Sequence, residues 1–312
     1  MPNQKIIVML GPTATGKSDL AVFLAKKFSG EVVSADSRQV YKGLDIGTGK
    51  VPRDPTNYKL QTTNYLYKGV PHHLIDVANP KRVFTVSQYK KFGEKALQDI
   101  WQREKLPIIC GGTGFYIQAL IDGIILPEVP PNKKLRTQLE KKSVAELFTM
   151  LKKLDPRRSK EIDRKNPRRL IRAIEIAKYL GKVPYLEARL PSNTDILQIG
   201  IDMPDEMLKE RIGKRLKTRI KKGMIREAIR LNRQGLSWKR MEGLGLEYRY
   251  MARYLQGKIS KEEMVIQLAH EIWQYAKRQR TWFKRDKRIK WVLPKQKKIV
   301  EKLVSGFLWR MR

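Results

Sequence analysis

The stretch GPTATGKSD at positions 11–19 constrains the fold most, because it fits the phosphate-loop pattern G-x-x-x-x-G-K-[ST]. The apolar run at 6–10 predicts a buried strand before it, and residues 18–28 predict a helix after it. In such a unit, backbone N–H groups and the helix dipole hold anionic oxygens, Lys17 adds a full positive charge, and the Ser18 hydroxyl can hold Mg²⁺. Loops of this kind usually bind nucleoside triphosphates, which favours an NTPase or a kinase as the first interpretation.

The acidic residues do not fit that interpretation well. A phosphate-loop NTPase normally carries a metal-binding Asp at the end of a second apolar strand. The best such strand, at 107–110, runs into Gly-Gly-Thr-Gly, and the acid is instead Asp36, which follows Glu-Val-Val-Ser-Ala at 31–35. An Asp at the carboxyl end of a parallel strand faces the ligand crevice, where it can bind metal or abstract a proton. The sequence equally allows Asp36 to cap the turn that follows.

The charge distribution predicts a polyanionic partner. The chain of 312 residues holds 66 Lys+Arg against 31 Asp+Glu, a net charge of +35. Residues 1–126 carry 17 basic and 10 acidic residues, whereas residues 127–312 carry 49 and 21. A net charge of +28 concentrated in the second part indicates nucleic-acid binding, because a small substrate has no use for it.

Other features of the composition exclude several classes. No apolar run approaches ~18 residues, so we expect no membrane span, and the first strand begins by Ile6, which leaves no room for a signal peptide. A single cysteine, Cys110, excludes an internal disulfide and a cysteine-rich zinc site. We therefore expect a cytoplasmic protein.

The order of apolar segments predicts an α/β fold with a mostly parallel sheet flanked by helices. Between 127 and 195 the character changes: a proline-rich break, LPEVPPNKK, precedes helical patterns at 132–153 and 167–180. We interpret 127–195 as a helical insertion into a catalytic core made of 1–126 and 196–312. The expected core strands are 6–10, 31–36, 74–77, 107–112 and 196–202.

Two long helices are predicted after the last strand. In Met207–Leu231, apolar residues recur every four positions, and a neighbouring ridge carries Arg211, Arg215 and Arg219. This ridge is either a solvated flank or a row directed at phosphates. The second helix, Lys261–Arg285, interleaves aromatic and basic residues, a pattern that suits a core face beside a nucleic-acid contact.

Seven segments together resemble the tRNA dimethylallyltransferase family. They are GPTATGKSDLA, SADSRQVYKGLDIGTGK, PHHLIDV, FTVSQY, GGTGFYIQAL, NPRRLIRAIEI and AKRQRTWFKRD, and the similarity runs from about Ile6 to Trp291. The resemblance implies a phosphate-loop NTPase-like fold. It also implies transfer of a dimethylallyl group from dimethylallyl diphosphate to N6 of the adenine just 3′ of the anticodon in tRNA.

The resemblance also implies a role for individual residues. The diphosphate would lie on Gly11, Pro12, Thr13, Ala14, Thr15, Gly16, Lys17 and Ser18, with Mg²⁺ bridged by Ser18. The catalytic residues would be Lys17, Asp36 as the base, Thr113 and Arg215. Contacts with the tRNA anticodon stem-loop would come from Asp36, Ser37, Arg38, Gln39, Thr113, Arg136, Arg168, Arg169, Leu170, Ile171 and Arg172. The protein is expected to act as a monomer.

One departure from the family pattern concerns residues 246–249, where Glu247 stands in place of a usual glycine. An acid near RNA phosphate would repel it, so an RNA contact by this segment is in question.

Two rival functions remain open from the sequence. One is a phosphate-loop kinase or a prenyltransferase acting on free nucleotides, and the other is a non-catalytic RNA-binding protein.

Overall fold

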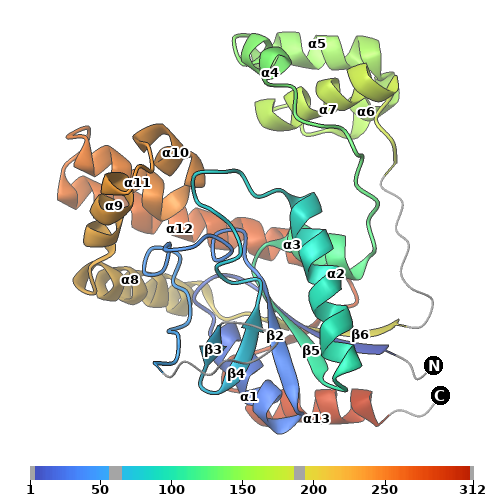
Figure 1. Cartoon of the computed structure of the whole chain (residues 1–312), viewed down its shortest axis with the longest axis vertical. Coiled ribbons are helices and arrows are strands. Elements are labelled where there is room, and N and C mark those ends of the chain that lie inside the picture. The colour runs from blue at the N-terminus through green and yellow to red at the C-terminus, as the bar shows by residue number, and fades with distance from the viewer. Residues whose placement is uncertain (1–3, 56–64, 186–193, 310–312) are drawn as a thin grey trace. The chain divides into compact units, whose positions relative to one another are not determined.

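The computed structural model describes residues 4–55, 65–185 and 194–309. The chain divides into two compact units, one made of Met1–Asp122 and Leu190–Arg312 and the other of Gly123–Arg189 (Figure 1). The return segment of the expected insertion, 186–193, lies outside the described residues. Each unit has its own apolar core, so the chain leaves the sheet after Asp122 to build a separate body.

In the described part, the first unit is built on a seven-stranded sheet of order β3-β4-β2-β5-β1-β6-β7. All neighbouring pairs are parallel except β3 and β4, which form an antiparallel pair at one edge. The predicted fold class is therefore confirmed. The strands are β1 (Gln4–Leu10), β2 (Gly30–Ala35), β3 (Leu66–Tyr67), β4 (Val70–His73), β5 (Leu106–Gly111), β6 (Thr194–Ile201) and β7 (Lys290–Val292).

Helices cover both faces of this sheet (Figure 1). On one face α1 (Lys17–Lys27) and α13 (Lys297–Leu308) close an apolar core with alternate residues of β1 and β6. On the other face α2 (Val86–Gln102), α3 (Gly114–Ile121) and the C-terminal helices bury the remaining strand residues. Because β1, β2 and β5 are buried on both faces, their sequences do not alternate between apolar and polar residues, although β2 also buries Glu31 and Ser34.

The strand predicted at 74–77 is wrong, because the strand in this region is β4 and ends at His73. Leu74 and Asp76 have left-handed backbone angles, φ 62° and φ 58°, which a β-strand does not accommodate. Leu74 and Ile75 are nevertheless buried, so the apolar run marks a buried turn rather than a strand. The other four strands are confirmed to within two residues at each end.

Of the two long helices predicted after the last strand, the first is divided in two and the second is confirmed. The pattern at Met207–Leu231 is two helices, α8 (Asp205–Lys221) and α9 (Met224–Arg233), separated where Gly223 takes φ 100°. The helix predicted at Lys261–Arg285 is confirmed as α12 (Lys261–Phe283). Between α9 and α12 lie α10 (Trp238–Leu244) and α11 (Leu246–Leu255).

The second unit is a small helical body around the buried side chains of Leu147, Leu151, Leu170 and Ile174. The single helix predicted at 132–153 is two helices, because Ser143 caps a new one and forms a capping box with Glu146. Its helices are α4 (Lys133–Leu139), α5 (Val144–Leu154), α6 (Pro156–Glu161) and α7 (Pro167–Leu180). Across the ranges that the structure describes, no helix combines the length and apolar character that a membrane span requires.

Candidate active site

A cavity of about 350 Å³ lies at the carboxyl edge of the sheet, where the loops after β1, β2 and β5 meet α8 and α12. The carboxyl edge of a parallel sheet is where ligands of this fold class bind. Among the residues predicted for the site, those that line the cavity are Thr13, Ala14, Gly16, Lys17, Ser18, Asp36, Gln39 and Arg215. The cavity therefore brings together the phosphate loop, the acid after β2 and one arginine of the α8 ridge.

The phosphate loop follows β1 directly and ends at the N-terminus of α1. Gly11 has φ 133°, and a Cβ there would lie 2.3 Å from the Ile201 carbonyl oxygen, so only glycine fits against β6. Gly16 is the N-cap of α1, and its φ of 92° is a left-handed conformation that also favours glycine. Within the loop the Thr15 hydroxyl donates to the Pro12 carbonyl over 2.9 Å. These contacts leave Thr13, Ala14 and Ser18 facing the cavity.

Two cations reach the loop from different elements. The Lys17 ammonium donates to the Pro12 carbonyl and lies 3.5 Å from the Thr15 hydroxyl. Burial, together with the positive charge of Arg215, lowers the pKa of Lys17 to about 8. Arg215, from α8, donates to the Gly49 carbonyl over 3.0 Å. Burial is also the main cause that lowers the pKa of Arg215. Both groups are thus buried cations. Binding of an anionic ligand would offset the free-energy cost of burying their charge.

Asp36 caps the turn after β2 and lines the cavity at the same time. Its Oδ1 accepts from the backbone N–H groups of Arg38 and Gln39 over 2.8 and 3.2 Å. The turn interpretation of Asp36 is therefore confirmed. It does not exclude a chemical role, since a carboxylate has a second oxygen and these two bonds fix its orientation.

The loops after β2 and β5 are joined through Thr113. Its side chain accepts from the Ser37 N–H over 3.0 Å, and its own N–H donates to the Ala35 carbonyl over 3.1 Å. The Tyr275 hydroxyl of α12 is hydrogen-bonded to the Thr113 side chain, and burial raises the pKa of Tyr275 to about 12. Thr113, Ser37 and Arg38 border the cavity without lining it. Thr113 therefore links the Asp36 turn to a neutral tyrosine.

The sequence interpretation missed Gln279, which connects two loops of the site. Its amide oxygen accepts from the Thr13 N–H over 2.8 Å, and its amide nitrogen donates to the Gly112 carbonyl over 2.8 Å. A Cβ at Gly112 would lie 2.2 Å from that nitrogen, which explains the glycine. A signal was present, because Gln279 falls on the buried stripe of α12 with Ala276 and Phe283. A polar residue on an apolar stripe indicates a specific partner.

A second missed residue is Glu227 of α9, which is 5% exposed. Its carboxylate accepts from three consecutive backbone N–H groups, those of Asp45, Ile46 and Gly47, over 2.8–2.9 Å. The Tyr248 hydroxyl donates to the same carboxylate over 2.7 Å. The three backbone bonds hold the segment 45–49, whose Gly49 carbonyl accepts from Arg215. Glu227 therefore fixes the wall on which Arg215 rests.

The arginine ridge of α8 is not a uniform solvated flank. Arg211 reaches the Thr15 carbonyl over 3.4 Å, and Arg215 reaches the Thr13 hydroxyl over 3.4 Å. Arg219 turns away from the loop and pairs with Glu247 over 2.9 Å, with both side chains largely buried. The acid at the usual glycine position is therefore neutralised by a cation of this chain, so Glu247 does not present a free negative charge.

The candidate residues of the second unit fall into two groups. Arg136 and Arg172 both pair with the buried carboxylate of Glu175, while Leu170 and Ile171 lie in the core of the unit. Arg168 and Arg169 are exposed at the N-terminal end of α7. Arg169 lies 3.7 Å from Asp163.

Few protein groups are available for a metal ion. Within the described residues, no cluster of three or more His, Cys, Asp or Glu side chains could hold one. Ser18 and Asp36 line the same cavity, and Cys110 stands at the end of β5 with a pKa that burial raises to about 11. Mg²⁺ commonly uses one or two protein oxygens and completes its shell with substrate phosphates and water. The oxygens present fit that mode of binding.

Comparisons with known proteins agree with this geometry. A family model described as IPP transferase matches residues 39–286. The tRNA dimethylallyltransferase 2 of Treponema denticola is 47% identical over an alignment of 295 residues that covers 92% of this chain and 95% of that protein. The crystal structure of a tRNA isopentenylpyrophosphate transferase from Bacillus halodurans has a TM-score of 0.70 at 34% identity, covering 98% of this chain and 97% of the other. The structure of a eukaryotic dimethylallyltransferase acting on tRNA has a TM-score of 0.77 at 25% identity, covering 98% and 77%. The chain belongs to the IPP transferase family, the tRNA dimethylallyltransferases.

Proposed function

We propose that this protein transfers a dimethylallyl group from dimethylallyl diphosphate to N6 of the adenine 3′-adjacent to the anticodon in tRNA, and releases diphosphate. One observation carries the proposal. A single cavity of about 350 Å³ is lined by residues of the phosphate loop, including Lys17, by Arg215 and by Asp36. This is an anion site placed next to a proton acceptor, which suits substitution at a carbon that bears an anionic leaving group.

On the acceptor side, the weakly nucleophilic adenine amine attacks C1 of the dimethylallyl group. As the N–C bond forms and the C–O bond to diphosphate breaks, N6 loses a proton, and Asp36 takes it. Because Oδ1 is held by two N–H groups, the carboxylate keeps one orientation throughout the reaction. Thr113 and Gln39 border the space for the adenine, which must leave its stack in the RNA to enter the cavity.

On the donor side, the leaving group gains negative charge as the C–O bond breaks. Lys17, Arg215 and the N–H groups of the phosphate loop stabilise that charge, and they do so in a partly desolvated site where each interaction is strong. Ser18 would hold Mg²⁺ together with diphosphate oxygens, and the metal would supply further charge neutralisation.

The tRNA stem-loop would be held mainly by the basic second part of the chain. In the helical insertion, Arg168 and Arg169 are the direct phosphate ligands that we propose, because they are exposed at a helix N-terminus. Arg136 and Arg172 act through Glu175, which sets the position of α4 against α7. We further propose that the protein works in the cytoplasm as a monomer.

The test is to incubate the protein with unmodified tRNA, dimethylallyl diphosphate and Mg²⁺, and to weigh the RNA. We expect one added C5H8 unit on the adenine that follows the anticodon. Hydrolysis of ATP coupled to tight ATP binding would instead favour a kinase or NTPase. Prenylation of free AMP without tRNA would favour the small-molecule transferase, and tRNA binding without any mass gain would leave an RNA-binding protein.

The state of Lys17 predicts a pH dependence of donor binding. Its pKa is about 8 in the free protein, so the ammonium is present below that pH and lost above it. Affinity for a non-reactive thio analogue of the donor should be level below about pH 7.5 and fall by up to about tenfold per pH unit above about pH 8.5. Calorimetric titration checks this. The Lys17→Arg variant, which does not titrate in this range, is the control and should show a flat profile. Constant affinity of the unaltered protein to about pH 9.5 would contradict the assignment.

Glu227 predicts a second, indirect effect on the donor. In Glu227→Gln a single carbonyl oxygen must serve the three N–H groups of 45–47, so at least one loses its partner. We expect the free energy of unfolding to fall by about 2 kcal/mol. Because the Gly49 carbonyl then shifts away from Arg215, the KM for the donor should rise about tenfold.

The control for Glu227→Gln is Glu210→Gln, which removes an exposed acid from α8 whose one ion pair among the described residues is with Lys214. It should change neither quantity. If Glu227→Gln lowered stability and left the donor KM unaltered, Glu227 would be a purely structural residue.

A further inference from the structure

Tyr275 of α12 lines the catalytic cavity, and the proposed chemistry does not use it. The buried stripe of this helix runs through Ile272, Ala276 and Gln279, and Tyr275 lies beside that stripe rather than on it. Its side chain is partly exposed, which agrees with a position facing the cavity instead of the apolar core. A phenol in such a place has both a hydrogen-bond donor and an acceptor to offer a ligand.

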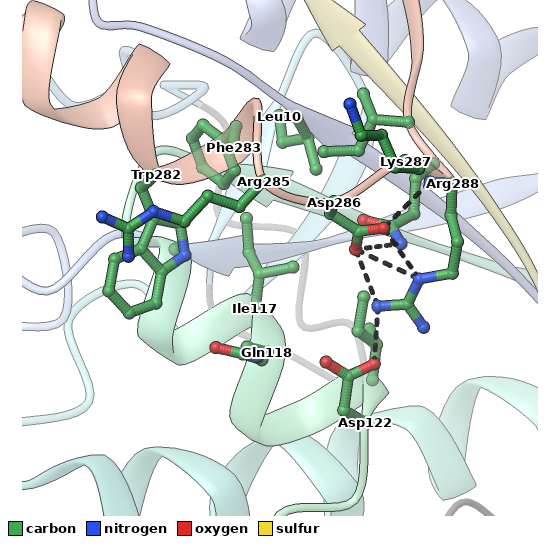
Figure 2. A pocket seen from close by; sticks show the side chains of 14 residues that line it. Leu10, Ile117, Gln118, Asp122, Trp282, Phe283, Arg285, Asp286, Lys287 and Arg288 are labelled. Atoms are coloured by element: carbon green, nitrogen blue, oxygen red, sulfur yellow. Dashed lines mark hydrogen bonds and ion pairs between the residues drawn. The ribbon is translucent and has the colours of Figure 1, made fainter. Parts of the chain in front are cut away.

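The loop that carries Thr113 is held tightly against α12 on both sides. On one side the Gln279 amide donates to the Gly112 carbonyl over 2.8 Å. On the other, a Cβ on Gly114 would lie 2.2 Å from Trp282 Cδ1, so the indole packs directly on this glycine. Figure 2 shows Trp282 where this end of α12 meets α3 at the edge of a neighbouring cavity. Thr113, between the two glycines, therefore has a fixed place against the helix.

The hydrogen bonds around Thr113 run in one direction. The Ser37 N–H can only donate, and it donates to the Thr113 Oγ1 over 3.0 Å. The Thr113 side chain is bonded in turn to the Tyr275 hydroxyl. Burial raises the pKa of Tyr275 to about 12, and the bond from Thr113 acts in the opposite direction, as a bond accepted by the phenol oxygen does. The phenol thus accepts from Thr113 and keeps its own hydrogen at neutral pH.

That hydrogen is left for a ligand. Among the residues that the structure describes, Thr113 is the one side chain hydrogen-bonded to the Tyr275 hydroxyl. After burial, the negative charge of Asp36 is the next cause that raises the pKa of Tyr275, so the phenol lies near the proposed base. A donor that faces a cavity without a partner gains free energy when a ligand brings an acceptor to it.

The target adenine has acceptors in the right place. Its N6 amine is flanked by two ring nitrogens, N1 and N7, and both accept hydrogen bonds. We propose that the Tyr275 O–H donates to one of these nitrogens and so sets the position of N6 relative to Asp36. Thr113 and Ser37 orient the phenol for this contact. The inference rests on the proposed function for the identity of the base.

The test is a double-mutant cycle between the phenol and the base. Anticodon stem-loops carry adenosine, 1-deazaadenosine or 7-deazaadenosine at the target position, and kcat/KM for transfer is measured with the unaltered protein and with Tyr275→Phe. With adenosine, Tyr275→Phe should lower kcat/KM by about five- to tenfold, the loss of one hydrogen bond between neutral groups. With one of the two deaza analogues it should cause no further loss, because the accepting nitrogen is already absent.

The other deaza analogue is an internal control, since Tyr275→Phe should lower its kcat/KM by the same factor as for adenosine. Tyr67→Phe is the matched protein control, because it removes a tyrosine hydroxyl of β3 from the same cavity. Its effect should be the same for adenosine and both analogues. An equal loss with all three RNAs for Tyr275→Phe, or no loss with adenosine, overturns the proposal.

Thr113 supplies a second pair of variants in case Tyr275→Phe is poorly folded, which thermal unfolding shows. Thr113→Ser keeps the hydroxyl that orients the phenol and should retain the selective loss with one deaza analogue. Thr113→Val removes that hydroxyl, leaves the phenol free to rotate and should reduce the selectivity. If the serine and valine variants treat all three RNAs alike, the oriented contact does not exist.

The two proposals fail in different ways. Normal transfer to the stem-loop with no coupling between Tyr275 and either nitrogen would retain the activity and remove this contact. If no dimethylallyl group is transferred, the same cycle is measured by stem-loop affinity without donor. Coupling there would retain the contact and remove the activity, and its absence would remove both. Tyr275→Phe should bind a non-reactive thio analogue of the donor normally, and a loss of that affinity would place the O–H on diphosphate instead.

Discussion

Asp36→Asn is expected to lower the single-turnover rate of dimethylallyl transfer by about 10²–10⁴-fold while tRNA and donor affinity survive. The asparagine oxygen can still accept from the N–H groups of Arg38 and Gln39, so the turn after β2 is retained. The amide that replaces the second oxygen cannot take a proton. Rates measured with saturating enzyme separate this chemical defect from a binding defect.

The matched control is Asp19→Asn, which removes the same charge from the same cavity at a side chain that is exposed. It should retain most of the rate. Repeating the Asp36→Asn measurement at high Mg²⁺ tests a metal-ligand role, because only that role predicts partial recovery. A near-normal rate for Asp36→Asn would show that Asp36 is not the base. If instead tRNA affinity were lost while the rate of transfer at saturating enzyme stayed normal, Asp36 would be a recognition residue.

Arg215→Ala should slow transfer by about 10²–10³-fold without lowering stability. In the described part of the structure the Arg215 guanidinium has no carboxylate partner, and burial lowers its pKa, so the folded protein bears a cost for this charge. Removing it relieves that cost and takes away one stabilising contact to the diphosphate. Thermal unfolding and single-turnover kinetics on the same preparation measure the two effects.

Arg219→Ala, one turn further along α8, is the counterpart and should behave in the opposite way. It leaves the largely buried Glu247 carboxylate without its cation, so the free energy of unfolding should fall by about 3 kcal/mol. The transfer rate of the folded fraction should stay within a few fold of normal. If the two variants were indistinguishable in rate and stability, the division of the ridge into a functional and a structural arginine would be wrong.

The sequence predicted the parts of the site that depend on local pattern. The phosphate loop, the acid after β2 and the parallel sheet follow from short-range signals, namely the glycine spacing and the continuous apolar runs. Leu74–Val77 could not be assigned from pattern alone, since its burial comes from tertiary contacts: the Asp76 N–H donates to the Gln39 carbonyl and its carboxylate pairs with Lys50. β7 was missed because three residues paired with β6 carry no local signal.

Other misses had signals that a closer inspection finds. Ser143 and Glu146 have the spacing of a capping box, which marks a new helix start inside the pattern at 132–153. Gly223 marks the break between α8 and α9. Gln279 and Glu227 are polar residues on buried stripes, although their partners, the phosphate loop and the segment 45–47, are far away in sequence and only the fold brings them together.

The position of Gln279 on α12 has a thermodynamic consequence. Gln279 holds the donor loop through the Thr13 N–H, and about one helical turn earlier the same helix places Tyr275 against Thr113, beside the proposed adenine site. A ligand that biases the position of α12 at one residue alters the free energy of binding at the other. tRNA and donor are then expected to change each other's affinity by one common factor, because such linkage is reciprocal.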